Sequence, residues 1–466
     1  MTSTPPIAAG IFKAYDIRGI VDDTLTESAV RSIGLVLGAR AKAAGIASIV
    51  VGRDGRLSGP RLAAALSSGI TEAGCDVIDI GMVPTPLVYF ATVLTGSGSG
   101  VAVTGSHNPP EYNGLKMMLG GVTLYGDDIT SIGTRIAAPE GLAALKAATA
   151  GRVTQRDVLS EYLAKVVGDV KLARPMKIAI DAGNGVAGAV APRLLKSIGC
   201  ELVELYCDVD GNFPNHHPDP AHPENLQDLI AAVKAHDCEL GLAFDGDGDR
   251  LGVVTRSGEI VFPDRQLMLY AKDVLSTRPG AQVIYDVKCT RNLAPWIRQH
   301  GGVPLMWRTG HSLIKAKLKE TKAPLAGEMS GHVFFNDRWY GFDDGCYTAA
   351  RLLEILSRER DPSAVLEALP DSPTTPELHL KLAEGANFRL IEALQKQGDI
   401  AGATEINTID GVRAEYPDGF GLARASNTTP VVVLRFEADT PQALARIQQG
   451  FRSAILSIDP SVKLPF

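Results

Sequence analysis

Hydrophobic and polar positions follow a repeated order along most of this chain. Short apolar runs alternate with amphipathic helical segments and polar turns, and the order restarts near residues 176 and 281. Apolar runs between helices are typical of buried strands in α/β layers, where some of the strands are parallel. Each stretch therefore predicts one α/β domain of similar design, and the expected boundaries are residues 1–150, 151–256 and 257–368.

The clearest elements of these stretches can be named by their sequence. Helices are expected at residues 25–44 and 60–74, with strands in the runs SIVVG and VIDIG. The second stretch reads as strand MKIAI, turn DAGNGVAG, helix AVAPRLLKSIG and strand CELVELYC. The third reads as strand AQVIYDV, a turn at residues 288–291, helix NLAPWIRQHG and strand VPLMW.

The last stretch, residues 369–466, has a different pattern. TPELHLKL and VVVLRFEA are typical of strands, and NFRLIEALQKQ is typical of a helix. Asp410-Gly411 and Asp418-Gly419 are hairpin dipeptides, and Thr440-Pro441 is a good start for a final helix. We expect a small α+β domain with an antiparallel sheet. Chains with several domains commonly bind their ligand in a cleft between them, so the chemistry should lie on loops from several domains.

Composition and charge narrow the class of protein. Of the 466 residues, 45% are hydrophobic and 21% are charged, which is ordinary globular usage and excludes wholesale disorder. A formal net charge of −7 without a basic stripe argues against nucleic-acid binding. No apolar window of about 18 residues exists, and the start MTSTPPIAAG lacks the pattern of a signal peptide. From the absence of such a window we expect no membrane partner. The six cysteines form no CxxC pair, so we expect reduced thiols in a cytoplasmic protein.

The motif FDGDGDR places Asp245, Asp247 and Asp249 in alternation with glycines, between two apolar runs. Three carboxylates in one short loop would repel one another without a cation, and oxygen ligands select a hard ion such as Mg²⁺. An EF-hand loop is excluded, because its sixth and twelfth positions would be Arg250 and Arg256. The alternative is a solvated Asp-Gly turn. We favour it less, because the loop contains three aspartates in register rather than one.

A second motif, VTGSHNPPEYNGLK, predicts a strand that leads into a loop stiffened by prolines. Ser106 at the start of this loop is a candidate nucleophile or phosphate carrier, if a base lies near it. Lys116 follows ten residues later and can serve as a base or bind phosphate. The surrounding sequence is not G-x-S-x-G, so the nucleophile elbow of hydrolases does not apply. A Ser/Asn/Pro turn without chemistry is an equal alternative on this motif alone.

Two further motifs have a structural interpretation that we favour. The residues from Gly183 to Gly188 read G-x-G-x-x-G between a strand and a helix, and Glu201 and Glu204 follow, which is the dinucleotide-binding pattern. A second set of Rossmann strands does not follow, so a tight turn is preferred. The run NHHPDPAH could suggest zinc, but its prolines and spacing favour a loop, and its histidines are His216, His217 and His222.

Three polar loops remain as candidates for binding anions and hydroxyls. MWRTGHSLIK and LAGEMSGHVFF supply Arg and His side chains together with hydroxyl and carboxyl groups, at Arg308, Thr309, His311, Glu328, Ser330 and His332. ARASNTTP has the composition of a phosphate-binding turn, with an arginine next to hydroxyl groups and backbone N–H donors. Its candidate residues are Arg424, Ser426, Asn427 and Thr428.

Six of these segments together resemble one known family. In chain order they are AYDIRG, TGSHNPPEYNGLK, FDGDGDR, RTGHS, GEMSGH and RASNTTP, and they resemble the α-D-phosphohexomutase superfamily over essentially the whole chain. GEMSGH and the Ser-His-Asn-Pro loop are similar to the bacterial phosphomannomutase/phosphoglucomutase branch. The resemblance implies an α/β fold: three related α/β domains with mixed sheets, and a C-terminal α+β domain with an antiparallel sheet, around one central cleft.

The resemblance also implies a mechanism. Ser106 would be a phosphoserine with one phosphate oxygen on a Mg²⁺ ion held by Asp245, Asp247 and Asp249. It would exchange its phosphoryl group with a hexose phosphate, so that hexose 1-phosphate becomes hexose 6-phosphate through a hexose 1,6-bisphosphate. The implied catalytic side chains beside Ser106 are Arg18, Lys116, Arg250 and His332. The implied substrate-binding residues are Tyr15, Lys288, His311, Glu328, Ser330, His332, Arg424, Ser426, Asn427 and Thr428.

The resemblance also implies a role for each of these residues, and these roles agree with what each group can bind. Arg424 and its loop would hold the phosphate that does not react, and Glu328 with Ser330 would bind neighbouring sugar hydroxyls. We expect glucose 1,6-bisphosphate as the activator, sugar phosphates as the only partners, and a monomer. The alternatives are a phosphoglucosamine mutase, an NAD-dependent dehydrogenase built on the Gly183 turn, and a sugar-phosphate binder without catalysis.

Overall fold

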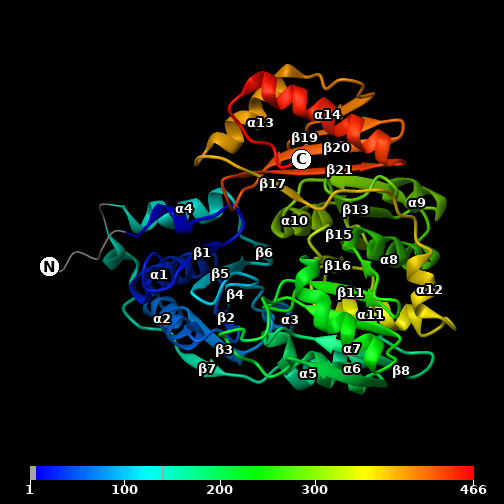
Figure 1. Cartoon of the computed structure of the whole chain (residues 1–466). Helices are drawn as coiled ribbons and strands as arrows, with labels where there is room; N and C mark the ends of the chain where they lie inside the picture. The colour runs from blue at the N-terminus through cyan, green and yellow to red at the C-terminus, as the bar shows by residue number, and fades with distance from the viewer. Residues whose placement is uncertain (1–6, 139–140) are drawn as a thin grey trace. The chain divides into compact units, whose positions relative to one another are not determined.

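A computed structural model describes residues 7–138 and 141–466 of the chain (Figure 1). The first six residues, which open the MTSTPPIAAG segment, lie outside the described residues. The chain divides into two compact units. The first unit holds the described residues up to Pro263 with Lys315–Lys322 and Ser330–Ala368, and the second unit holds Asp264–Ile314, Ala323–Met329 and Leu369–Phe466. Over the described ranges, no helix is both long and apolar enough to span a bilayer.

The first sheet of the first unit is mixed, with the strand order β1-β5-β4-β2-β3-β7 and β6 beside β5. β2 runs parallel to β3 and β4, whereas β5 is antiparallel to both β1 and β4. The strands are β1 (Ile17–Ile20), β2 (Ser48–Arg53), β3 (Asp76–Met82), β4 (Gly100–Val103), β5 (Tyr112–Leu119), β6 (Val122–Thr123) and β7 (Val153–Gln155). The helices are η1 (Ala9–Ile11), α1 (Glu27–Ala43), α2 (Gly59–Glu72), α3 (Thr85–Leu94), α4 (Asp127–Ile136) and η2 (Leu142–Leu145).

α1 and α2 confirm the predicted helices and cross at very short range. A Cβ atom at Gly34 would lie 2.3 Å from the Leu66 carbonyl oxygen, and one at Gly69 would lie 2.0 Å from that of Arg31. The two glycines therefore let the helix backbones touch while their apolar faces cover the sheet (Figure 1). The sequence did not predict α3, and it predicted a loop where β5 begins. Asn113 and Gly114 at the start of β5 interrupt the alternation of hydrophobic and polar residues that is typical of a strand.

The second sheet of the first unit has the order β12-β11-β10-β8-β9. β8 is parallel to β9 and β10, and β10 and β11 form an antiparallel hairpin. The strands are β8 (Met176–Asp181), β9 (Cys200–Leu205), β10 (Leu240–Phe244), β11 (Leu251–Thr255) and β12 (Ile260–Val261). The helices around it are α5 (Leu159–Asp169), η3 (Val186–Ala189), α6 (Ala191–Ser197), η4 (Pro223–Leu226) and α7 (Gln227–Ala235). The first unit also contains β16 (Val333–Phe335), α11 (Gly345–Leu356) and α12 (Pro362–Glu367).

The second unit contains a parallel set of strands and an antiparallel sheet. β13 (Gln282–Asp286) lies between β14 (Val303–Trp307) and β15 (Leu325–Gly327), and is parallel to both. The helices of this part are α8 (Pro263–Thr277), α9 (Leu293–Gln299) and α10 (His311–Thr321), and the boundary between the units falls within α10. The predicted strands AQVIYDV and VPLMW are confirmed.

The C-terminal sheet is antiparallel throughout, with the order β17-β21-β20-β19-β18. Its elements are β17 (Leu378–Lys381), α13 (Ala386–Gln397), β18 (Glu405–Asn407), β19 (Val412–Tyr416), β20 (Gly419–Ala425), β21 (Val431–Ala438) and α14 (Pro441–Ile458). Both predicted hairpins are present. Thr440 caps α14, because its hydroxyl accepts a hydrogen bond from the Ala443 N–H at 3.2 Å. Local sequence signals were sufficient for this domain.

Candidate active site

The loop between β10 and β11 holds the three aspartates of FDGDGDR. Asp245, Asp247 and Asp249 are completely buried, and one carboxylate oxygen from each lies within 4.8 Å of the others. The loop folds on itself because the Gly248 backbone is left-handed (φ 74°) and the Asp249 N–H donates to the Asp245 Oδ1 atom at 3.1 Å. Burial and the charges of Asp249 and Asp247 hold the pKa of Asp245 well above its ordinary value. Such a cluster is stable only beside positive charge.

Lys116 supplies part of that charge from β5. Its Nζ lies 2.7 Å from the Asp247 Oδ2 atom and 2.6 Å from the Asp249 Oδ2 atom. Burial lowers the pKa of Lys116, but the two carboxylates outweigh burial and hold that pKa well above the ordinary value. Lys116 is therefore an ammonium ion inserted between two aspartates, which the sequence did not predict.

Ser106 lies against the aspartates at the end of β4. Its Oγ donates to the Asp245 Oδ2 atom at 3.0 Å and lies 3.1 Å from the His107 Nδ1 atom. Ser106 has φ 50°, an uncommon conformation for a residue with a side chain, and its N–H donates to the Thr104 Oγ1 atom at 2.7 Å. A strained turn thus points a buried hydroxyl at the acidic loop, joining two motifs 139 residues apart.

Arg56 holds the Ser106 loop in place, and the sequence analysis missed it. Its guanidinium donates to backbone carbonyls on both sides of the loop, at Ser106 (2.8 Å), Asn108 (2.5 Å), Pro109 (2.5 Å) and Tyr112 (2.9 Å). Its Nε also pairs with the Asp54 Oδ2 atom at 3.2 Å, and only 1% of Arg56 is exposed. The sequence feature that could have indicated Arg56 is RDGRLSG, a charged loop directly after a buried strand.

Two further predicted arginines lie close to the same centre. Arg18, on β1, donates to the Gly105 carbonyl at 3.3 Å and also to the Asn108 side chain. The Nε of Arg250 lies 3.7 Å from the Asp245 Oδ2 atom. Tyr15 lies half-buried in the segment before β1. The Arg18 guanidinium therefore lies against the Ser106 loop, and the Arg250 guanidinium lies against the acidic loop.

His332 and Ser330 reach the site from the segment before β16. The His332 Nε2 atom lies 3.3 Å from the Asp249 Oδ1 atom and 3.4 Å from the Arg250 Nε atom. The Ser330 Oγ atom lies 2.9 Å from the other ring nitrogen of His332. The first unit thus gathers Ser106, the three aspartates, His332 and four basic side chains, which are Arg18, Arg56, Lys116 and Arg250.

The second unit gathers another group of predicted residues. Arg424, at the end of β20, is buried and donates to the Asp410 Oδ2 atom at 3.0 Å, and the same oxygen accepts from the Thr309 N–H at 2.9 Å. Asp410 therefore ties the RTGHS loop to the ARASNTTP loop, a link that the sequence did not show. Within the latter loop, the Ser426 and Thr428 hydroxyl oxygens lie 3.3 Å apart. An arginine beside such a turn suits a phosphate group.

Glu328, His311 and Lys288 also belong to the second unit. The Glu328 Oε1 atom accepts from the Gly310 N–H at 2.6 Å, which places this carboxylate next to His311 at the start of α10. The Lys288 Nζ lies 2.6 Å from the Glu377 Oε1 atom. Arg308 is exposed. Glu377 was not predicted, since nothing in PELHL marks it.

The two motifs interpreted as structural have structural contacts. A Cβ atom at Gly188 would lie 2.1 Å from the Cys207 carbonyl oxygen, so this glycine permits backbone packing. Glu201 and Glu204 pair with lysines of the same domain, at 3.7 and 2.5 Å. His216 pairs with the Asp181 Oδ2 atom at 3.0 Å. In the described ranges, the groups with metal-ligand geometry are Asp245–Asp247–Asp249 and Asp249–His332–Asp343, and neither includes the NHHPDPAH histidines.

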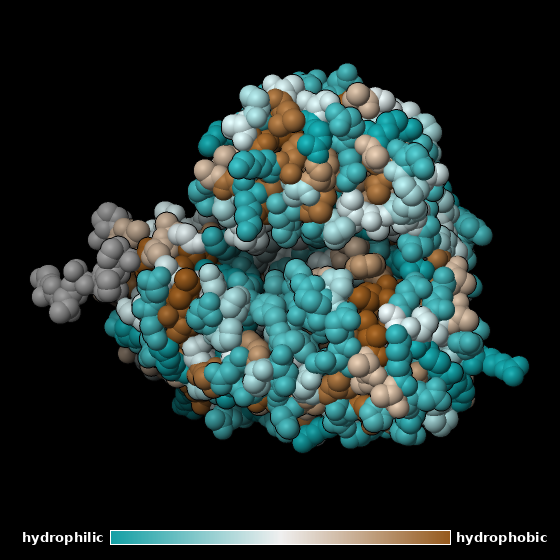
Figure 2. Space-filling view, viewed as in Figure 1, coloured by the Kyte–Doolittle hydropathy of each residue, from teal (hydrophilic) through white to brown (hydrophobic). Residues whose placement is uncertain are grey.

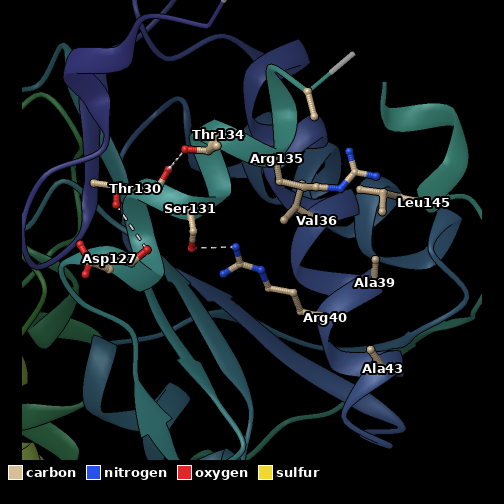
Figure 3. A pocket seen from close by; sticks show the side chains of 11 residues that line it. Val36, Ala39, Arg40, Ala43, Asp127, Thr130, Ser131, Thr134, Arg135 and Leu145 are labelled. Atoms are coloured by element: carbon tan, nitrogen blue, oxygen red, sulfur yellow. Dashed lines mark hydrogen bonds between the residues drawn. The ribbon is translucent and has the colours of Figure 1, made fainter. Parts of the chain in front are cut away.

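A separate surface hollow lies between α1 and α4 (Figure 3). It has a volume of about 640 Å³, and Arg40 reaches across it to the Ser131 hydroxyl at 2.9 Å. None of the predicted site residues lines it.

The face seen in Figure 2 is mostly hydrophilic, with hydrophobic residues in small separate patches.

Comparison with known proteins agrees with this geometry. Four phosphoglucomutase/phosphomannomutase family models match the chain in order: α/β/α domains I (9–141), II (160–258) and III (262–372), and the C-terminal domain (377–454). A phosphoglucomutase of Neisseria gonorrhoeae is 60% identical, covering 97% of this chain and 98% of its own. A phosphomannomutase/phosphoglucomutase of Pseudomonas aeruginosa is 54% identical over 99% of both chains. A crystal structure of a phosphoglucomutase/phosphomannomutase family protein from Burkholderia thailandensis is 60% identical with a TM-score of 0.93, covering 99% of this chain and 100% of its own. The chain therefore belongs to the phosphoglucomutase/phosphomannomutase family.

Proposed function

We propose that this enzyme interconverts hexose 1-phosphates and hexose 6-phosphates, of both glucose and mannose, with Ser106 as the phosphoryl carrier. The observation that carries the proposal is the buried contact between the Ser106 Oγ and the acidic loop, with Lys116, Arg18 and Arg250 around it. Phosphoryl transfer depends mainly on positioning and charge neutralisation, and these side chains supply both.

The acidic loop also fits a divalent cation. The Asp247 Oδ1 atom is buried and has no hydrogen-bond partner among the described residues, which suits an oxygen that binds a cation. Three carboxylates without nitrogen or sulfur ligands suit Mg²⁺, which Asp245, Asp247 and Asp249 would hold. When bound, Mg²⁺ would neutralise charge on the phosphoryl group at Ser106.

In the proposed reaction, the Ser106 phosphoryl group passes to the 6-hydroxyl of a hexose 1-phosphate. The new P–O bond forms on the sugar, the P–Oγ bond breaks, and the hydroxyl proton leaves through a base, for which His332 is the candidate. Lys116, the other candidate that the sequence offered, is an ammonium ion between Asp247 and Asp249 and would supply positive charge instead. Transfer of the 1-phosphate back to Ser106 then releases hexose 6-phosphate. Arg18 and Arg250 would bind the phosphoryl oxygens throughout.

The remaining predicted residues would recognise the rest of the substrate. Arg424, Ser426, Asn427 and Thr428 would bind the phosphate that is not transferred. Glu328, together with Ser330, would accept hydrogen bonds from the 3- and 4-hydroxyls, and Lys288, His311 and Tyr15 would line the sugar. We further propose that glucose 1,6-bisphosphate activates the enzyme by phosphorylating Ser106, and that the enzyme is a cytoplasmic monomer.

The test is the intact-protein mass before and after treatment with glucose 1,6-bisphosphate, with peptide mapping of the added phosphate. We expect one phosphate on Ser106, and expect Ser106→Ala to lose both the phosphate and nearly all mutase activity. Ser68→Ala is the matched control, because Ser68 is an exposed serine on α2. Phosphate on another residue, or full activity in Ser106→Ala, would refute the proposal.

A further inference from the structure

The acidic loop has a second anchor, at the start of α3. Thr85 is the first residue of α3 and is 1% exposed. Its Oγ1 donates to the Asp247 Oδ2 atom at 2.5 Å, and its backbone N–H donates to the Asp247 carbonyl at 2.9 Å. The first N–H groups of a helix have no partner within the helix, so this one is available for Asp247. One residue thus binds both the side chain and the backbone of a candidate metal ligand.

The two carboxylate oxygens of Asp247 have different surroundings. The Oδ2 atom accepts from the Thr85 hydroxyl and from the Lys116 Nζ. The Oδ1 atom is buried and, within the described part of the chain, has no hydrogen-bond partner. Rotation of the carboxylate plane about the Cβ–Cγ bond would break both Oδ2 bonds and turn the other oxygen away from its present direction. The Thr85 hydroxyl therefore holds the carboxylate plane in the orientation that presents one unpaired oxygen.

We propose that Thr85 is a positioning residue for the metal site, which keeps the Asp247 Oδ1 atom oriented for the cation. The inference rests on the proposed Mg²⁺ site. It assigns a role in metal binding to α3, which lies in the region matched to domain I, whereas Asp247 lies in the region matched to domain II. Pro86, directly after Thr85, restricts the backbone conformation of Thr85.

A purely structural role for Thr85 makes a different prediction from a positioning role. Thr85→Val keeps the shape of the side chain and removes the hydroxyl, whereas Thr85→Ser keeps the hydroxyl and removes a methyl group. If Thr85 orients Asp247, only the valine variant weakens metal binding. Loss of a hydrogen bond that orients a metal ligand typically lowers metal affinity roughly 10–100-fold.

The measurement is Mn²⁺ binding to the full-length, dialysed protein, followed by the electron paramagnetic resonance signal of free Mn²⁺. All variants are first treated with glucose 1,6-bisphosphate, so that their phosphorylation state matches. Thr92→Val is the matched control, because Thr92 is a buried threonine on the same helix whose hydroxyl donates to the Tyr89 carbonyl. Asp247→Asn reports on the metal site itself.

We expect roughly 10–100-fold weaker Mn²⁺ binding in Thr85→Val, with Thr85→Ser and Thr92→Val within about twofold of the parent protein. Equal loss in the valine and serine variants, or none in the valine variant, would overturn the role of Thr85. Unchanged binding in Asp247→Asn would instead refute the proposed metal site. If Thr85→Val does not fold, Thr85→Ala replaces it with the same expected loss.

Discussion

Replacing Arg56 by methionine should destabilise the first unit far more than replacing an exposed arginine. Methionine keeps much of the apolar stem and removes the guanidinium. That group links Asp54 to four carbonyls of the Ser106 loop, and the Asp54 side chain is only 3% exposed. The change therefore leaves a buried carboxylate without its cation and releases the loop that carries Ser106.

The magnitude follows from these contacts. Removing one partner of a buried ion pair costs ~3–5 kcal/mol, because the other charge stays buried. The Asp54 carboxylate keeps its bonds to the Thr104 hydroxyl at 2.7 Å and the Gly105 N–H at 3.2 Å, which favours the lower half of that range. At ~2–4 °C per kcal/mol, a loss of ~3–4 kcal/mol corresponds to a fall in Tm of roughly 6–16 °C.

The pH dependence of this loss has a definite sign. Burial already raises the pKa of Asp54 above its ordinary value, with Arg56 only partly opposing it. Without Arg56, the folded state should bind a proton at Asp54 more tightly still, while the unfolded state keeps a pKa of ~3.9. Stability of the variant then falls as pH rises from ~4 through the folded pKa of Asp54. The difference in Tm between parent and variant should be larger at pH 8 than at pH 5.

Differential scanning calorimetry measures both effects. Arg61→Met is the control, because Arg61 pairs with Asp22 and Glu27 at the surface, and such pairs contribute ~0–1 kcal/mol. If Arg56→Met lowers Tm no more than Arg61→Met does, Arg56 does not hold the loop.

Four further outcomes are expected. Exhaustive chelation should abolish mutase activity and Mg²⁺ should restore it; full activity in the chelated enzyme would exclude the aspartates as an essential metal site. Arg424→Ala removes charge-assisted hydrogen bonds of ~1.5–3 kcal/mol each, so the KM for hexose phosphate should rise roughly tenfold or more in steady-state assays. An unchanged KM would exclude Arg424 from the phosphate site. Glucose 1-phosphate and mannose 1-phosphate should have kcat/KM values within about a hundredfold, some 2.7 kcal/mol, because the epimers differ only at the 2-hydroxyl and the phosphates supply most of the binding. A larger preference for one sugar phosphate would reveal a protein group that binds the 2-hydroxyl and distinguishes its two orientations. The hydrogen bond to Asp181 outweighs burial and raises the pKa of His216, so its stabilisation is present below the unfolded pKa of ~6.5 and is lost as pH rises through the folded pKa. His216→Gln should therefore lower Tm more at pH 5.5 than at pH 9, and an equal loss at both would contradict the pairing.

Local patterns were enough to predict most of the elements that carry the site. The runs LGLA and LGVV enclose FDGDGDR, and they form the β10–β11 hairpin that buries the three aspartates. Thr440-Pro441 starts α14, and Asp418-Gly419 closes a hairpin. Each of these depends on neighbours along the chain, whose backbone preferences are set by residue type. The resemblance to a known family additionally indicated which motifs, distant in sequence, belong to one site.

Contacts between distant elements were decided by the tertiary structure alone. Arg56 and Thr85 occur in RDGRLSG and VPTP, which read as ordinary surface loops, yet both side chains are buried against the residues that they hold. Lys116 lies between two aspartates because β5 is paired with β4, a register set by packing across the sheet. Residue types and spacing specify which groups can do chemistry. Which hydrogen-bond donor pairs with which buried oxygen depends on how separate elements pack. No single stretch of the sequence determines that packing.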